Sequence, residues 1–143
     1  MTARIRMASA ADAEALAGLM AELGYAHTAE GIRDLQAEIV ARGGAVIVAE
    51  GEGRLLGCVS ALLDVRLAEG RCGEVASLVV AEAYRGQGLG AELVAAAEAW
   101  LGPLVDRVRV RAHVGRREAH AFYCRRGYRE VKDQRLFARS TPA

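Results

Sequence analysis

The stretch of sequence best suited to chemistry is glycine-rich, RGQGLG at residues 85–90. It follows an apolar run and precedes a segment with helical spacing. At a helix start, backbone N–H groups lack intrahelical partners and the aligned peptide dipoles place partial positive charge there. Glycines let the main chain approach a bulky anion without Cβ clashes. The tract therefore predicts a phosphate or pyrophosphate site, to which Arg85 adds a charged donor.

Other interpretations of a glycine-rich loop compete with this one. A Walker loop ends in Gly-Lys-Ser/Thr, whereas Gly90 is followed by Ala91 and Glu92. A Rossmann fingerprint opens a βαβ unit and leads to an acidic residue at the end of the next strand. Here the next alternating segment ends in His113 and Val114. A glycine turn that merely joins a strand to a helix is the remaining, purely structural alternative.

The elements around the tract follow from hydrophobic periodicity. Residues 72–81 (CGEVASLVVA) are bounded like a buried strand, and residues 91–101 have helical spacing. Residues 106–114 alternate as a half-buried strand does, and a short helix over 116–126 closes at Gly127. One or two final strands are expected after it. The helix stripe comprises Leu89, Leu93, Ala97 and Trp100, and the solvated face of strand 106–114 carries Arg107, Arg109 and Arg111.

The N-terminal half predicts two helices and a hairpin. A short strand at residues 5–7 leads to Ser9, which opens a helix with Asp12 as its capping-box partner. Gly24 ends that helix, and a second one runs from about Ala29 to the Gly43-Gly44 pair. Residues 45–50 and 54–63 then read as two strands joined by a glycine-containing turn.

Composition limits the class of protein. The chain has 143 residues, 52% of them hydrophobic and 26% charged, so a single globular domain over 1–143 is expected rather than a disordered chain. With 19 basic and 18 acidic residues, the net charge of +1 provides no global field for nucleic acid or an anionic membrane. Cys58, Cys72 and Cys124 show neither disulfide nor zinc-ligand spacing. No apolar run approaches the roughly 18 residues of a membrane span, so a cytoplasmic protein is expected.

Two tracts together resemble the GNAT superfamily of N-acetyltransferases. LVVAEAYRGQGLGAELV is similar to the family's strand–turn–helix motif with R/Q-x-x-G-x-G/A, and REAHAFYCRRGYREV is similar to its later A-x-x-F/L-Y-x-x-x-G-F/Y segment. The resemblance extends from the N-terminal strand to Phe137. It implies an α/β fold with a mixed, mostly antiparallel twisted sheet, splayed between its fourth and fifth strands and flanked by about four helices.

The resemblance also implies where acetyl-CoA, the acyl donor, binds. Its pyrophosphate would lie on the amides of 86–90, and its pantetheine would pair with the main chain of strand 72–81, with an N–H near Val80 directed at the thioester oxygen. No metal is expected. The implied cofactor-binding residues are Leu78, Val79, Val80, Arg85, Gly86, Gln87, Gly88, Leu89 and Gly90.

Two residues are the catalytic candidates. Tyr123 matches the family position that faces the sulfur, which implies a general acid for the departing thiolate, although a buried tyrosine on an amphipathic helix is the structural alternative. Glu74 is the only acidic residue in strand 72–81 and occupies a place where some family branches carry a base; an ordinary strand charge explains it equally well.

Other polar residues remain without a firm role. His120 lies one turn before Tyr123; a surface residue of its helix is the favoured interpretation, and a proton relay or substrate contact is the alternative. Tyr25 and His27 occupy the loop that usually shapes the acceptor pocket in the family, and a capped loop explains them equally well. Arg116 stands where many family members have an asparagine, so that contact is not carried over.

The expected function is therefore acetyl transfer from acetyl-CoA to a primary amine of a small molecule, amino sugar or peptide. A non-catalytic acyl-CoA sensor is the alternative, and a nicotinamide-dependent oxidoreductase is a more distant one. The oligomeric state is left open by the sequence, with a homodimer as one candidate because family members often form dimers, while nucleic-acid and membrane partners are not expected.

Overall fold

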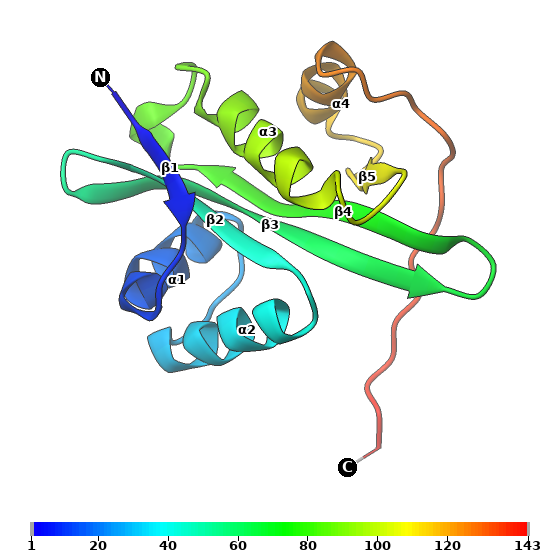
Figure 1. The fold of residues 1–143 in the computed structure, drawn as a ribbon, viewed down its shortest axis with the longest axis horizontal. Helices are drawn as coiled ribbons and strands as arrows, with labels where there is room; N and C mark the ends of the chain where they lie inside the picture. Colours follow the sequence, from blue (N-terminus) through cyan, green and yellow to red (C-terminus); the bar gives the residue numbers. More distant parts are fainter. Residues whose placement is uncertain (1, 143) are drawn as a thin grey trace. The chain divides into compact units, whose positions relative to one another are not determined.

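The computed structural model describes residues 2–142, which fall into two compact units (Figure 1). The first spans Met1–Arg111 and the second Ala112–Ala143. The first unit holds every strand of the described chain and is built around one sheet. The second holds a single helix.

The sheet has five strands in the order of the sequence: β1 (Arg4–Met7), β2 (Ala45–Gly51), β3 (Arg54–Arg66), β4 (Gly70–Val80) and β5 (Val108–Val110). The first four pair antiparallel, and β5 runs parallel to β4. Pairing between β4 and β5 covers three residues of each strand, from Gly73↔Val108 to Val75↔Val110. The predicted mixed, mostly antiparallel sheet that opens between its fourth and fifth strands is therefore confirmed.

Helices cover both faces of this sheet (Figure 1). On one face lie the short 3₁₀ helix η1 (Ala10–Asp12), α1 (Ala13–Glu22) and α2 (Ala29–Ala41). The amide of Ser9 donates to Asp12 Oδ2 at 2.7 Å, and Thr28 Oγ1 accepts from Gly31 N at 3.0 Å, so side chains cap both helical segments. The opposite face is covered by α3 (Leu89–Leu101).

The core lies between the helices and the central strands. On the α1/α2 face, buried side chains of both helices meet Val48, Cys58 and Val79. On the α3 face, glycines allow close packing: a Cβ at Gly73 would come within 2.9 Å of Leu101 Cδ1. The buried residues of α3 are Leu89, Leu93, Val94, Ala97 and Leu101.

Trp100 does not belong to the buried stripe of α3 as predicted. It is 40% exposed, and its indole Nε1 donates to the carbonyl of Gly43 at 3.3 Å, while Leu101 is fully buried. A partly wet position with an acceptor suits indole, which has an N–H to satisfy.

In the second unit, α4 (Arg117–Arg125) ends before Gly127, whose φ of +91° gives the expected left-handed helix stop. The one or two strands predicted after it are not observed, since residues 128–142 have no regular secondary structure. The apolar residues of this segment, Val131, Leu136 and Phe137, are exposed. Strand propensity becomes a strand only where a neighbouring chain completes the ladder, and the second unit offers none among its described residues.

Candidate functional site

The glycine-rich tract forms the connection between β4 and α3. After β4 ends at Val80, the chain makes the short helix η2 (Glu82–Tyr84), turns through residues 85–88 and enters α3. Gly86 and Gly88 have φ angles of +79° and +85°, and a Cβ at either would meet no atom within 4 Å. Glycine is therefore required here by backbone conformation, and the space outside the turn is open.

The main chain of this turn presents a row of unused donors. Within the described chain, none of the amide N–H groups of residues 86–91 donates a hydrogen bond, and the first helical bond at this end is donated by Glu92 to Gly88 O. Such donors are favourable for an anion, because the helix dipole adds partial positive charge at the same place. The binding of a phosphate by these residues stays a prediction.

The guanidinium of Arg85 contacts the end of β4 and a carboxylate of α1. Its Nε donates to the carbonyl of Val80 at 2.9 Å, and one terminal nitrogen lies 3.6 Å from Glu22 Oε1. The amide of Glu82 also donates to Glu22 Oε1, at 3.3 Å. The guanidinium therefore ties the turn to the end of β4 and to α1. Its contact with a bound phosphate stays a prediction.

The end of β4 offers a second set of main-chain groups. Residues 76–80 have no β5 partner in the described chain, while their other edge pairs with β3. The amide of Ala81 donates to Leu56 O on β3, so the period-two alternation of a strand directs the N–H and C=O of Val80 to the unpaired edge. Leu78 and Val80 are half-buried, and Val79 packs into the core on the α1/α2 face.

β4 contains a β-bulge that the sequence did not predict. Ser77 has φ of +51°, and the pairing register with β3 shifts between Cys58↔Val79 and Ser60↔Ala76. The hydroxyl of Ser60 donates to Ala76 O at 3.0 Å, and the thiol of Cys58 lies 3.7 Å from Ser77 O. Bulges bend a strand and change which way the residues after them face. Glycine often marks such a position, and the serine here gave no comparable signal.

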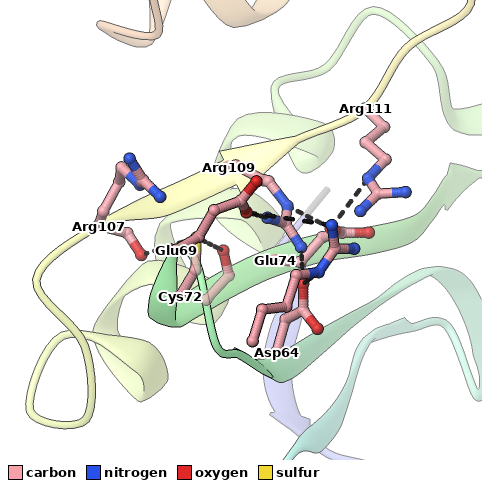
Figure 2. A network of polar contacts seen from close by, with 9 residues as sticks. Asp64, Glu69, Cys72, Glu74, Arg107, Arg109 and Arg111 are labelled. Carbon is pink, nitrogen blue, oxygen red and sulfur yellow. Dashed lines mark hydrogen bonds and ion pairs between the residues drawn. The ribbon is translucent and has the colours of Figure 1, made fainter. Parts of the chain in front are cut away.

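Glu74 lies in a network of ion pairs on β3, β4 and β5 (Figure 2). Its Oε1 accepts from Arg109 Nε at 2.7 Å and lies 3.3 Å from Arg111 Nε. Arg109 also donates to Glu69 Oε2 at 3.1 Å and to Asp64 Oδ2. The side chains of Glu74 and Arg109 are only 18% and 22% exposed.

The prediction of a solvated arginine face is therefore wrong for Arg109. Burial lowers the pKa of its guanidinium, but hydrogen bonds to Glu74 and Asp64 raise it by more, and the net shift is upward. The same hydrogen bond from Arg109 lowers the pKa of Asp64, with help from the charge of Arg66. The shifts of Arg109 and Asp64 both favour the charged forms of these two groups at neutral pH.

Tyr123 belongs to the second unit, on α4. Its ring makes edge-on contacts with Phe122 and Tyr128, at centroid distances of 5.0 and 5.7 Å. Its hydroxyl contacts no polar group among the described residues. Burial raises the pKa of the phenol, while the positive charge of Arg116 works weakly in the other direction. The phenol is therefore protonated at neutral pH and has a proton to donate.

Among the described residues, the side chains of His120, Tyr25 and His27 make no hydrogen bond or ion pair with a candidate catalytic residue of their own unit. The Nε2 of His120 lies 2.8 Å from the carbonyl of His113, a contact within the same short segment. Tyr25 and His27 are exposed in the loop after α1.

Residues 2–142 contain neither a metal-ligand cluster nor a membrane-spanning helix. No three His, Cys, Asp or Glu side chains of this range are placed to hold a metal ion. None of the helices described is both long and apolar enough to cross a membrane.

Comparison with known proteins bears on the same elements. The model of the acetyltransferase (GNAT) family matches residues 13–128, which include the glycine-rich turn, Glu74 and Tyr123. No curated protein matches the chain.

Solved structures share the fold at low sequence identity. Glucosamine-6-phosphate N-acetyltransferase from Arabidopsis thaliana superposes with a TM-score of 0.84 at 21% identity, covering 96% of this chain and 99% of that one. A putative acetyltransferase from Agrobacterium tumefaciens gives 0.82 at 24% identity, covering 95% and 99%. The aminoglycoside N-acetyltransferase AAC(6')-Iy, solved with CoA, gives 0.84 at 17% identity, covering 98% and 96%.

Proposed function

The chain belongs to the acetyltransferase (GNAT) family, and on this premise we propose that it transfers an acetyl group from acetyl-CoA to a primary amine. The observation that carries the proposal is the row of unused amides at 86–91, which lies directly beyond the unpaired edge of β4. The amides of 86–91 would bind the diphosphate, and the unpaired edge of β4 would bind the pantetheine. Both binding surfaces consist of main-chain groups.

The turn and the strand have distinct tasks in this proposal. The amides of 86–90 bind the pyrophosphate of CoA, because they are aligned donors at the start of α3. The pantetheine amides lie along the edge of β4 at Leu78, Val79 and Val80, as an added strand would, and they pair with the main-chain groups of Leu78 and Val80, since those of Val79 face β3. The N–H of Val80, directed to that edge, donates to the thioester oxygen and stabilises the oxyanion formed during attack.

The reaction proceeds by direct attack. The amine nitrogen attacks the thioester carbon, the tetrahedral intermediate collapses, and the C–S bond breaks to release CoA thiolate. The thiolate, with a thiol pKa of about 8.5 by analogy with cysteine, takes a proton from the phenol of Tyr123. The attacking nitrogen loses its second proton as the amide forms, and this proton restores the phenol, directly or through water. The raised pKa of Tyr123 keeps that proton in place until the sulfur carries charge.

The other proton transfer involves Glu74. An alkylamine with a pKa of about 10.4 arrives protonated and must lose a proton before it attacks. Glu74 accepts it, directly or through water. Its Oε1 is occupied by Arg109 and Arg111, whereas its Oε2 accepts no hydrogen bond from a described residue and is available to the acceptor.

The test combines binding with turnover. Calorimetry is expected to show acetyl-CoA binding, and a thiol reagent is expected to detect free CoA when acetyl-CoA is mixed with a panel of primary amines. Binding without thiol release from any amine would instead identify a sensor of acyl-CoA. A protein stabilised thermally by NAD and not by acetyl-CoA would refute the proposed coenzyme.

A further inference from the structure

The place where β5 leaves β4 is occupied by two opposite charges. The last β4–β5 pair is Val75↔Val110, so Glu74 lies one residue before the last paired residue of β4, and Arg111 directly follows the last paired residue of β5. Under the proposed function, the acyl group approaches along the β4 edge that begins at this point. The acceptor amine has to meet it beside these two side chains.

The two charges are only partly used by the protein. The three nitrogens of the Arg109 guanidinium each contact a different carboxylate, those of Glu74, Glu69 and Asp64. Arg111 makes one contact, from Nε to Glu74 Oε1, and its side chain is 52% exposed against 22% for Arg109. The terminal nitrogens of Arg111 donate no hydrogen bond to a described residue. Figure 2 shows its guanidinium turned toward the network from the end of β5.

Two groups therefore remain available to a ligand: the Oε2 oxygen of Glu74 and the two terminal nitrogens of the Arg111 guanidinium. A protonated amine is a partner for the oxygen, and a carboxylate is a bidentate partner for the fork. The network itself contains three carboxylates (Asp64, Glu69 and Glu74) and three guanidiniums (Arg66, Arg109 and Arg111). A ligand with no net charge leaves this balance unchanged, whereas an acceptor carrying only amines leaves Arg111 facing a second cation.

We propose that the acceptor is an aminocarboxylate, with its amine at Glu74 and its acidic group on Arg111. This inference rests on the proposed function and narrows its substrate class. The Nε contact of Arg111 with Glu74 holds the two groups side by side, so the acid and the amine of the acceptor belong on the same or neighbouring carbons, as in a free amino acid. Arg109 acts as a positioning residue, because it fixes the carboxylate of Glu74 without presenting a free donor itself.

Matched acceptors test the assignment. Thiol release is measured with intact protein at saturating acetyl-CoA, using amino acids and the corresponding amino acid amides, which keep the amine and remove the negative charge. The acids are expected to have kcat/KM about tenfold or more above that of their amides, since a site with a charged donor discriminates against an analogue that leaves it unpaired. Equal values for acids and amides in the unmodified protein would overturn the proposal.

Variants assign the discrimination to one side chain. Arg111→Gln is expected to bring acids and amides to similar kcat/KM, and Arg111→Lys to restore part of the preference. Arg107→Gln makes the same charge change at an exposed arginine whose side chain contacts no described residue, and it should leave the preference intact. A preference that survives Arg111→Gln would overturn the role of Arg111.

The failure of this inference can be told apart from the failure of the proposed function. If amides and simple amines are acetylated as fast as amino acids, the aminocarboxylate class is refuted and the acetyltransferase function still stands. Acetyl-CoA binding without thiol release from either class removes both.

Discussion

The hydroxyl of Tyr123 meets no polar group in the described chain, while its ring makes edge-on contacts with Phe122 and Tyr128. A donor that is positioned by packing and not consumed by an internal hydrogen bond is available to a substrate. Burial, which raises the pKa of this phenol, disfavours its anion and preserves its proton. The residue thus has the protonation state that a thiolate leaving group needs.

Tyr123→Phe is accordingly expected to lower kcat by about 100-fold or more, the usual contribution of a positioned acid. The acetyl-CoA affinity measured by calorimetry should stay within about twofold, because the ring packing is retained. Tyr128→Phe makes the same chemical change in the same aromatic cluster and should leave most of the activity. Unchanged turnover in Tyr123→Phe at every pH would remove this residue from the mechanism.

Gly88 gives a residue-scale test of the anion site. Gly88→Ala places a Cβ on a backbone with φ of +85°, which costs about 1–2 kcal/mol and pulls the turn toward another conformation. We expect acetyl-CoA affinity to fall at least tenfold. Gly53→Ala is the matched control, since its φ is +74° and its surroundings are equally open, but it lies in the β2–β3 turn. An equal loss of affinity in both variants would point to general destabilisation instead of a specific site.

At the scale of elements, local patterns predicted most of the fold. The α1 and α2 boundaries, the hairpin at Glu52 and Gly53 and the α3 start all follow from caps, glycines and periodicity that lie within a few residues. The bulge at Ser77 and the network around Arg109 do not. Arg109 meets Glu74 and Asp64 across 35 and 45 residues of sequence, so their contact depends on strand register. A single sequence specifies the alternation within a strand but not the register between strands.

The start of α1 is held by an ion pair whose effect depends on pH. Arg6 of β1 donates to both carboxylate oxygens of Asp12, at 2.8 and 2.9 Å, and also to Glu50. These bonds from Arg6 lower the pKa of Asp12, against the opposing effect of burial. Because the folded pKa lies below the unfolded value, the stabilisation is present above the ordinary carboxyl range and is lost as pH falls through the folded pKa.

Asp12→Asn should therefore lower the free energy of unfolding at pH 7 by about 2 kcal/mol, since it leaves Arg6 without its main partner. The difference from the unmodified protein should shrink as pH is lowered through the acidic range, as measured by urea unfolding at a series of pH values. Glu38→Gln breaks the exposed pair with Arg42 on α2 and should cost less than about 0.5 kcal/mol. A pH-independent loss in Asp12→Asn would assign the effect to packing and not to charge.

At the scale of the whole molecule, the two units differ in how they are held together. The first has a sheet with helices on both faces and a core of fully buried side chains such as Leu56, Val59 and Leu93. The second has α4, whose residues are half-buried or exposed, and a C-terminal segment without regular structure. Main-chain groups of the first unit carry the proposed coenzyme contacts, whereas the proposed proton donor, Tyr123, belongs to the second unit.

This difference predicts the order in which a protease acts. The segment 129–139 contains four exposed sites for trypsin, at Arg129, Lys132, Arg135 and Arg139, on backbone that pairs with no strand of the described chain. Limited digestion followed by mass spectrometry should show these bonds cut first, with the bonds after residues of β3 and β4 cut last. If the segment instead resists trypsin, it is paired as a strand, as its sequence predicts. If that resistance increases with protein concentration, the partner is a second copy of the chain, because only pairing between molecules depends on concentration.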